Sequence, residues 1–225
     1  MVGKRDILDS LEIFLAAYPD GRERYLEFSE FVEECREGAY CDRKNFCGHL
    51  TVSGFIFSRE GDRVLMLRHR ALGRWLQPGA PLEPPDRSLA EAVLRETGEE
   101  TGFGEADLRA LSPLRCAPGG GEPGSGMPVP DFALPGFPRP AAGPVPIGLN
   151  SHPIPVNPAK REDAHVHYDL RFAFQYAGDP GAVRCHAAES EGFRWVPLEE
   201  LRDDPDFGEV ALRAGKLDLV RFPRK

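Results

Sequence analysis

Acidic and apolar residues share one predicted helical face between residues 88 and 101. With about 100° of rotation per helical residue, three glutamates continue the apolar stripe that should pack inward. Carboxylates that point toward the protein body repel one another and resist desolvation unless a cation accompanies them. Hard oxygen ligands suit Mg²⁺ or Mn²⁺, so the pattern predicts a divalent-metal site. The residues of this face are Leu89, Ala92, Val93, Glu96, Glu99 and Glu100.

The ends of this helix are also marked in the sequence. Asp86 and Ser88 are both good N-cap residues, and Gly102 readily takes the left-handed conformation that ends helices. We therefore expect a helix from residue 88 to residue 101. Arg95 and Glu99 are spaced i, i+4, so this pair can orient one carboxylate.

The same residues match a known motif. Gly79 followed by Arg95-Glu96-x-x-Glu99-Glu100-x-Gly102-Phe103 resembles the Nudix box. Just upstream, Trp75-Leu76-Gln77-Pro78-Gly79 resembles the strand and turn that lead into that box. The resemblance covers about residues 48 to 202.

The loop before the helix departs from the motif. Ala80 stands where the box usually opens with a glycine, and Thr97 replaces the usual aliphatic residue. One extra residue lies between Asp86 and Arg95. These departures affect the loop, including a metal contact from the Ala80 carbonyl, and leave the helical acids intact. Three prolines stiffen the loop because each fixes its backbone φ angle; they are Pro81, Pro84 and Pro85.

The resemblance implies an α/β fold, namely a Nudix-type α/β/α sandwich with a mixed β-sheet. It also implies a divalent-metal-dependent hydrolase that cleaves the pyrophosphate of a nucleoside diphosphate linked to another moiety. Mg²⁺ or Mn²⁺ would be the cofactor, with Glu96 and Glu100 as its best ligands. Glu99 would be a third ligand or a base, the Ala80 carbonyl a further ligand, and Arg95 the group that orients Glu99.

Residues outside the helix complete the predicted site. In many Nudix relatives a glutamate in a later loop acts as a base or an extra metal ligand. Glu189 and Glu191 are the candidates by position, and no motif decides between them; we assign the catalytic role to Glu191. Arg68, Arg70 and Arg74 lie near the start of the box loop and are expected to contact substrate phosphate.

Two other functions fit the same motif. A nucleotide-binding regulator that has kept the fold and lost turnover is favoured by the altered loop. A diphosphate isomerase requires an additional catalytic pair, often including a cysteine, that the sequence does not reveal. The residues do not distinguish among nucleoside triphosphates, nucleotide sugars, ADP-ribose and biosynthetic diphosphates as ligands.

Residues 165 to 175 alternate between polar and apolar side chains, as half-buried strands do. The polar side either faces solvent or lines a substrate pocket. In the second case His165, His167 and Asp169 are the substrate-binding candidates. A histidine–metal site is a weaker form of that interpretation.

Composition excludes several classes of protein. The chain has 225 residues, 41% of them hydrophobic, which is enough for one main core with additions. A net charge of −8 gives no electrostatic footprint for a nucleic-acid backbone, and no apolar run approaches the length of a membrane span. The expected partner is therefore a small nucleotide or diphosphate substrate.

The residues after Met1 show no secretory pattern, so we expect a cytoplasmic protein with reduced thiols. Cys41, Cys47 and His49 lack the Cys-x-x-Cys pair typical of zinc sites.

The length of the chain predicts two additions to one domain. Residues 1–46 are expected to form an N-terminal helical arm that caps the domain, makes a homodimer contact or completes the pocket. Residues 47–225 are expected to form the Nudix domain. Within it, residues 118–158 contain 12 of the chain's 22 prolines and are predicted to be an insertion, either a lid over the site or a mobile segment.

Overall fold

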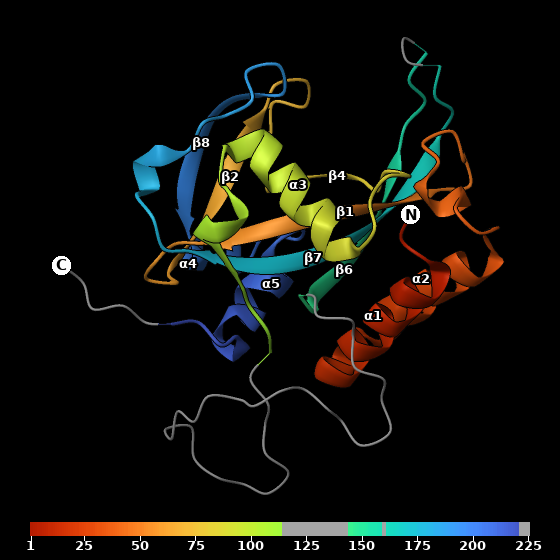
Figure 1. Cartoon of the computed structure of the whole chain (residues 1–225), viewed down its shortest axis with the longest axis horizontal. Helices are drawn as coiled ribbons and strands as arrows, with labels where there is room; N and C mark the ends of the chain where they lie inside the picture. The colour runs from red at the N-terminus through yellow and green to blue at the C-terminus, as the bar shows by residue number, and fades with distance from the viewer. Residues whose placement is uncertain (114–143, 159–160, 221–225) are drawn as a thin grey trace, which may run out of the picture.

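An eight-stranded mixed β-sheet lies at the centre of the protein, with helices on both of its faces (Figure 1). The computed structural model describes residues 1–113, 144–158 and 161–220. The strands are β1 (His49–Phe57), β2 (Arg63–His69), β3 (Trp75–Leu76), β4 (Gly79–Pro81), β5 (Leu108–Ala110), β6 (Pro146–Ile154), β7 (His165–Tyr176) and β8 (Ser190–Pro197). The α-helices are α1 (Lys4–Ala17), α2 (Arg22–Glu34), α3 (Leu89–Thr101), α4 (Leu198–Leu201) and α5 (Gly208–Arg213).

Strand β1 organises the sheet. It runs parallel to β7 over its full length, from His49 opposite His167 to Phe57 opposite Gln175. Its other edge is divided, because β4 pairs with its first half and β2 pairs at Phe57, both antiparallel. Strands β5 and β6 continue the sheet beyond β7, and β3 and β8 pair with β2. The predicted mixed sheet is confirmed.

Helix α3 lies on β1 and has the ends that the sequence predicts. The Ser88 hydroxyl accepts a hydrogen bond from the Glu91 backbone N–H at 3.0 Å, and Gly102 ends the helix with a φ of 75°. The helix approaches β1 closely at Gly54, where an added Cβ would lie 2.9 Å from the Thr97 hydroxyl oxygen. The fully buried Thr97 thus packs against the glycine.

Apolar cores lie on both faces of the sheet, because successive side chains of a strand point to opposite faces. One core packs α1, α2 and α3 against even-numbered positions of β1; it includes Leu50, Val52, Ala92, Val93, Phe14 and Phe28. Another packs α4 and α5 against odd-numbered positions; it includes Phe55, Phe57, Leu201, Phe207 and Val210. The predicted α/β/α architecture is confirmed.

The N-terminal helices pack onto the domain as a cap. Tyr168 of β7 stacks on Phe31 of α2, with the ring centroids 4.0 Å apart. Arg213 of α5, which is 3% exposed, joins the two parts: it donates hydrogen bonds to the Ile147 carbonyl at 2.8 Å and to the Asp20 carboxylate at 3.0 Å. These contacts correspond to the first of the three roles predicted for the helical arm.

The predicted insertion at residues 118–158 differs in part from the structure. Residues 118–143 lie outside the described residues. The hypothesis that they form a lid therefore stays a prediction. Residues 146–154, in contrast, form β6 and pair with β7. The strand was not predicted because it contains Pro146 and Pro153, which cannot donate to a strand ladder. They are tolerated here because, among the described strands, β6 pairs with β7 alone.

The structure also shows the state of the cysteines and the character of the helices. The cysteines within the described residues are free; they are Cys35, Cys41, Cys47 and Cys185. No helix in the described part of the chain is both long and apolar enough to cross a membrane.

Candidate active site

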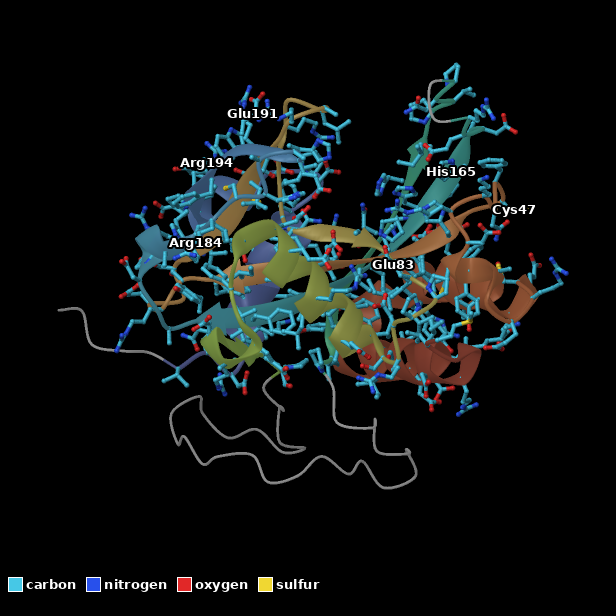
Figure 2. The ribbon with its side chains drawn as sticks, turned by 45° about the horizontal axis from the view of Figure 1, so that its top comes forward. Cys47, Glu83, His165, Arg184, Glu191 and Arg194 are labelled. Carbon is cyan, nitrogen blue, oxygen red and sulfur yellow. The ribbon has the colours of Figure 1, made fainter. Side chains whose placement is uncertain are left out.

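A cleft of about 1080 Å³ opens between the β6–β7 hairpin and the loops that flank β2 and β8. In Figure 2, His165 lies on the β6–β7 hairpin on one side, and Glu191 lies on β8 on the other. Residues of β1, β4 and α3 line the cleft between these two sides. Most of the groups that it gathers are polar or charged.

Three carboxylates meet in this cleft. Glu96 and Glu100 come from α3, and Glu189 comes from the loop before β8. One carboxylate oxygen of each residue lies within 4.8 Å of the corresponding oxygens of the other two. Glu96 and Glu100 are only 8% and 9% exposed, so water can stabilise little of their charge. We call these three residues the carboxylate cluster.

The electrostatics of the carboxylate cluster favour a bound cation. Burial, together with the charges of Glu96 and Glu189, raises the pKa of Glu100 to about 8. Burial also raises the pKa of Glu96, although the nearby Arg95 opposes this shift. A cation reverses such shifts, because it stabilises the ionised form that metal ligands require. A donor set made only of carboxylate oxygens fits Mg²⁺ or Mn²⁺.

Arg95 fastens the box loop to the helix. Its guanidinium donates to both carboxylate oxygens of Asp86, at 3.0 and 3.2 Å, and Asp86 is 3% exposed. The same carboxylate accepts a hydrogen bond from the Glu83 backbone N–H at 2.8 Å. Arg95 also lies 2.8 Å from Glu96 and 3.4 Å from Glu99. The predicted contact with Glu99 is therefore present, but the shorter contacts orient Asp86 and Glu96.

Glu99 lies outside the carboxylate cluster, and its predicted inward orientation is wrong. Its side chain is 61% exposed, whereas Thr97 and Thr101 are fully buried. The buried face of α3 is turned toward the two threonines, because Gly54 gives Thr97 room to pack on β1. Glu189 takes the third place in the cluster that was expected for Glu99.

The start of the box loop is part of the sheet. Ala80 lies in β4 opposite Val52 of β1 and lines the cleft. The preceding Gly79 has no room for a side chain, because an added Cβ would lie 2.7 Å from the Ser53 Cβ. The chain thus keeps glycine where the approach is close and accommodates alanine one residue later. Metal ligation by the Ala80 carbonyl stays a prediction.

Glu191 does not reach the carboxylate cluster, contrary to the role predicted for it. The pairing of β8 with β2 contains a β-bulge in this region, and a bulge breaks the regular alternation of side chains. Glu189 consequently lines the cleft, while Glu191 is not among the lining residues. Glu191 lies instead 3.7 Å from Arg68 and 3.6 Å from Arg70, in exposed ion pairs.

Two of the three predicted phosphate-binding arginines line the cleft. Arg70 and Arg74 are both partly exposed at its edge, where Arg74 forms an ion pair with Asp206 at 2.6 Å. The third, Arg68, is not a lining residue, and its guanidinium carbon lies 5.7 Å from the centre of the Trp75 ring. Arg70 and Arg74, and not Arg68, therefore line the cleft, and their contact with phosphate stays a prediction.

The polar side of β7 is buried along the cleft, so the first of the two predicted alternatives, exposure to solvent, is wrong. His165, Asp169 and Arg171 are each at most 6% exposed. The Asp169 carboxylate accepts hydrogen bonds from Thr51 at 3.0 Å, Ser53 at 2.8 Å and Arg171 at 3.3 Å. These bonds hold one wall of the cleft in place. The alternative prediction, that these residues line a pocket, agrees with this geometry.

Four histidines gather in the cleft, and we call them the histidine cluster: His49 of β1, His152 of β6, and His165 and His167 of β7. Their neighbouring ring centroids lie 4.4 to 5.3 Å apart. Burial, with the nearby histidines, lowers the pKa of His49 to about 4 and that of His167 to about 3. Burial also lowers the pKa of His152. The sequence pointed to His165 and His167 only, because the other two join them through strand pairing.

Residues 48–137 match the family model described as the NUDIX domain. No curated protein matches the sequence. Similar solved structures include a Caenorhabditis elegans Ap4A hydrolase binary complex, at 14% identity over 74% of this chain and 93% of that chain, with a TM-score of 0.42. They also include a NUDIX family hydrolase from Clostridium perfringens, at 20% identity over 74% of this chain and 95% of that chain, with a TM-score of 0.47. A third is the Escherichia coli dihydroneopterin triphosphate pyrophosphohydrolase, at 13% identity over 72% of this chain and 91% of that chain, with a TM-score of 0.47.

Proposed function

Because the chain carries a Nudix domain over residues 48–137, we propose that it is a divalent-metal-dependent hydrolase that cleaves the pyrophosphate of a nucleoside diphosphate linked to another moiety. The family predicted from the box residues is confirmed by the match. The observation that carries the proposal is the convergence of Glu96, Glu100 and Glu189 within 4.8 Å. Two of these carboxylates are buried, and a cation would favour the ionised form of all three.

The carboxylate cluster would hold Mg²⁺ or Mn²⁺. When bound, such an ion neutralises charge that develops on the pyrophosphate oxygens and activates water for attack. Glu96 and Glu100 are fixed by α3, whereas Glu189 comes from a loop on the far side and is exposed. Of the three, Glu189 is therefore the residue that we propose accepts a proton from the attacking water.

The rest of the cleft has room for both the phosphates of the substrate and the moiety linked to them. Its volume of about 1080 Å³ lies just above the range of about 300–1,000 Å³ for small-molecule sites. We place the phosphates beside Arg70 and Arg74 at the edge. The linked moiety would then face the wall formed by His165, His167 and Asp169.

The full-length protein is expected to hydrolyse at least one member of a panel of diphosphates when Mg²⁺ or Mn²⁺ is present. The panel contains nucleoside triphosphates, nucleotide sugars, ADP-ribose and non-nucleotide diphosphates, and release of phosphate or nucleotide is measured. Chelation of the metal should abolish turnover, because the carboxylates alone repel an anionic substrate. Undiminished turnover in chelator would contradict the proposal, and metal-dependent binding without product would favour the nucleotide-binding regulator.

Glu189→Gln is expected to lower kcat/KM of this reaction by about 10- to 100-fold, the range for losing groups that support a metal site. The matched control is Glu191→Gln, which removes the same charge two residues further on. Exposed ion pairs contribute little, so the control should stay within about twofold of the wild type. Steady-state kinetics on one substrate measure kcat/KM of both variants. A larger loss of kcat/KM in Glu191→Gln than in Glu189→Gln would assign the role of proton acceptor to Glu191.

A further inference from the structure

A second set of metal-binding side chains lies in the same cleft. One ring nitrogen from each of His49, His165 and His167 lies within 4.8 Å of the corresponding nitrogens of the other two. We propose that these three histidines bind a transition-metal ion such as Zn²⁺ at a site separate from the carboxylate cluster. Imidazole nitrogens suit zinc, whereas carboxylate oxygens suit Mg²⁺ and Mn²⁺, so the two sites would select different ions.

Strand pairing brings these rings together. His49 and His167 are register partners on the parallel strands β1 and β7. His165 precedes His167 by two residues and so points to the same side of β7. On the far edge of β7, His152 of β6 is also a register partner of His167. Three adjacent strands thus present their imidazoles in one row, with the half-buried His167 at its centre.

The separation between two of the rings matches a tetrahedral zinc site. The Nε2 atoms of His165 and His167 lie 3.2 Å apart. Two nitrogens at about 2.0–2.1 Å from a zinc ion are about 3.3–3.4 Å apart at the tetrahedral angle. The separation of these two nitrogens is therefore compatible with a shared ion once the rings turn toward it. Three protein ligands leave a fourth position, as in zinc sites that also bind water or a substrate.

A hydrogen bond already orients His165 as a ligand. Its Nδ1 lies 2.7 Å from the carbonyl oxygen of Asp163, which can only accept, so Nδ1 carries the proton. In the neutral ring the Nε2 lone pair is then free and is directed at His167. Metal-binding histidines commonly fix their second nitrogen in this way. Without an ion, the Nε2–H of His167 can donate to the Nε2 lone pair of His165. When an ion is bound, His167 takes the tautomer that carries its proton on Nδ1, so that its Nε2 is free to coordinate.

His49 supplies an independent observation. It is 2% exposed, and within the described part of the chain neither of its ring nitrogens has a hydrogen-bond partner. A neutral imidazole has one donor and one acceptor nitrogen, and leaving buried polar groups unpaired is unfavourable. Coordination of a metal ion would satisfy the acceptor nitrogen. Packing alone gives no partner to either nitrogen.

The test measures zinc binding by full-length protein that has been stripped of metal. Glu100→Gln serves as the background, because it weakens the carboxylate cluster and leaves the histidines intact. We expect this variant to bind one Zn²⁺ per chain by equilibrium titration, and Co²⁺ in its place to give the visible absorption of a tetrahedral site. Adding His167→Asn should weaken binding at least about 100-fold, because a direct ligand is lost.

The matched control adds His69→Asn to the same background. His69 also lines the cleft, but its Nδ1 accepts hydrogen bonds from the backbone of the following loop and it lies outside the cluster; zinc binding should persist. Equal zinc affinity with and without His167→Asn, or loss of zinc in Glu100→Gln alone, would overturn the proposal. A zinc-soaked crystal of the wild type gives a further test that does not depend on folding of a variant. An anomalous peak among the three rings supports the site, and its absence there overturns it.

Discussion

Replacement of Glu100 by glutamine is expected to lower kcat of the metal-dependent hydrolysis by at least about 100-fold. Loss of groups that only orient metal ligands costs about 10- to 100-fold, and Glu100 lines the cleft as a member of the carboxylate cluster. Glutamine keeps the size of the side chain and removes its charge, so the loss reports on ligation. Steady-state kinetics at increasing Mg²⁺ concentration measure it, and excess metal should restore part of the rate.

Glu91→Gln is the matched control, because Glu91 lies on the same helix and pairs with Arg87 at 3.1 Å on the exposed surface. Such pairs contribute about 0–1 kcal/mol, so kcat and the Mg²⁺ dependence should match those of the wild type. Full activity in Glu100→Gln would show that the carboxylate cluster takes no part in the reaction. An equal loss in both variants would indicate a general effect on α3.

In the metal-free protein, the contribution of Glu100 to the free energy of unfolding is expected to fall as the pH rises from 5 to 9, whereas the lowered pKa values of His49 and His167 act in the opposite direction below about pH 6.5. The pKa of Glu100 is about 8 in the folded protein, above its ordinary value of 4.5, because the group is buried beside other carboxylates. Between these values the folded protein holds a proton that the unfolded chain has released. The resulting stability is fully present below about pH 4.5 and is lost as the pH rises through about 8. At about 1.4 kcal/mol per pKa unit, the loss is on the order of 3–5 kcal/mol, measurable by denaturant unfolding in chelator.

Two changes should flatten this pH dependence. Glu100→Gln has no proton to lose, so at pH 8 the metal-free variant should be more stable than the wild type although it is the less active protein. Saturating Mg²⁺ should stabilise the wild type most at high pH, where the ligands are ionised. Glu91→Gln should keep the slope of the wild type. The same slope in Glu100→Gln would show that other groups cause it.

Local patterns in the sequence were sufficient to predict most of the fold. The box helix has a capping residue at Ser88 and a terminating glycine at Gly102, so both of its ends could be predicted from neighbouring residues. Alternation predicted β7 in the same way. Strand β6 was missed because two prolines and the absence of a clear alternation hide it, and only its pairing with β7 reveals it.

The site was less predictable because it depends on contacts between distant segments. Glu96 and Glu100 follow from helical periodicity, but the turn of α3 that excludes Glu99 is set by Gly54, about forty residues earlier. The choice between Glu189 and Glu191 depends on a bulge in β8, which no residue pattern predicts. The convergence of His49 with β7 likewise depends on strand register.

The stacking of Tyr168 on Phe31 links the N-terminal helices to the cleft through a single strand. Tyr168 lies between His167 and Asp169, whose side chains face the cleft, so the helices pack against the back of the strand that forms the cleft wall. Arg213 fastens the same helices to α5. The N-terminal helices thus support, from the opposite face, the strand whose side chains form this wall of the cleft.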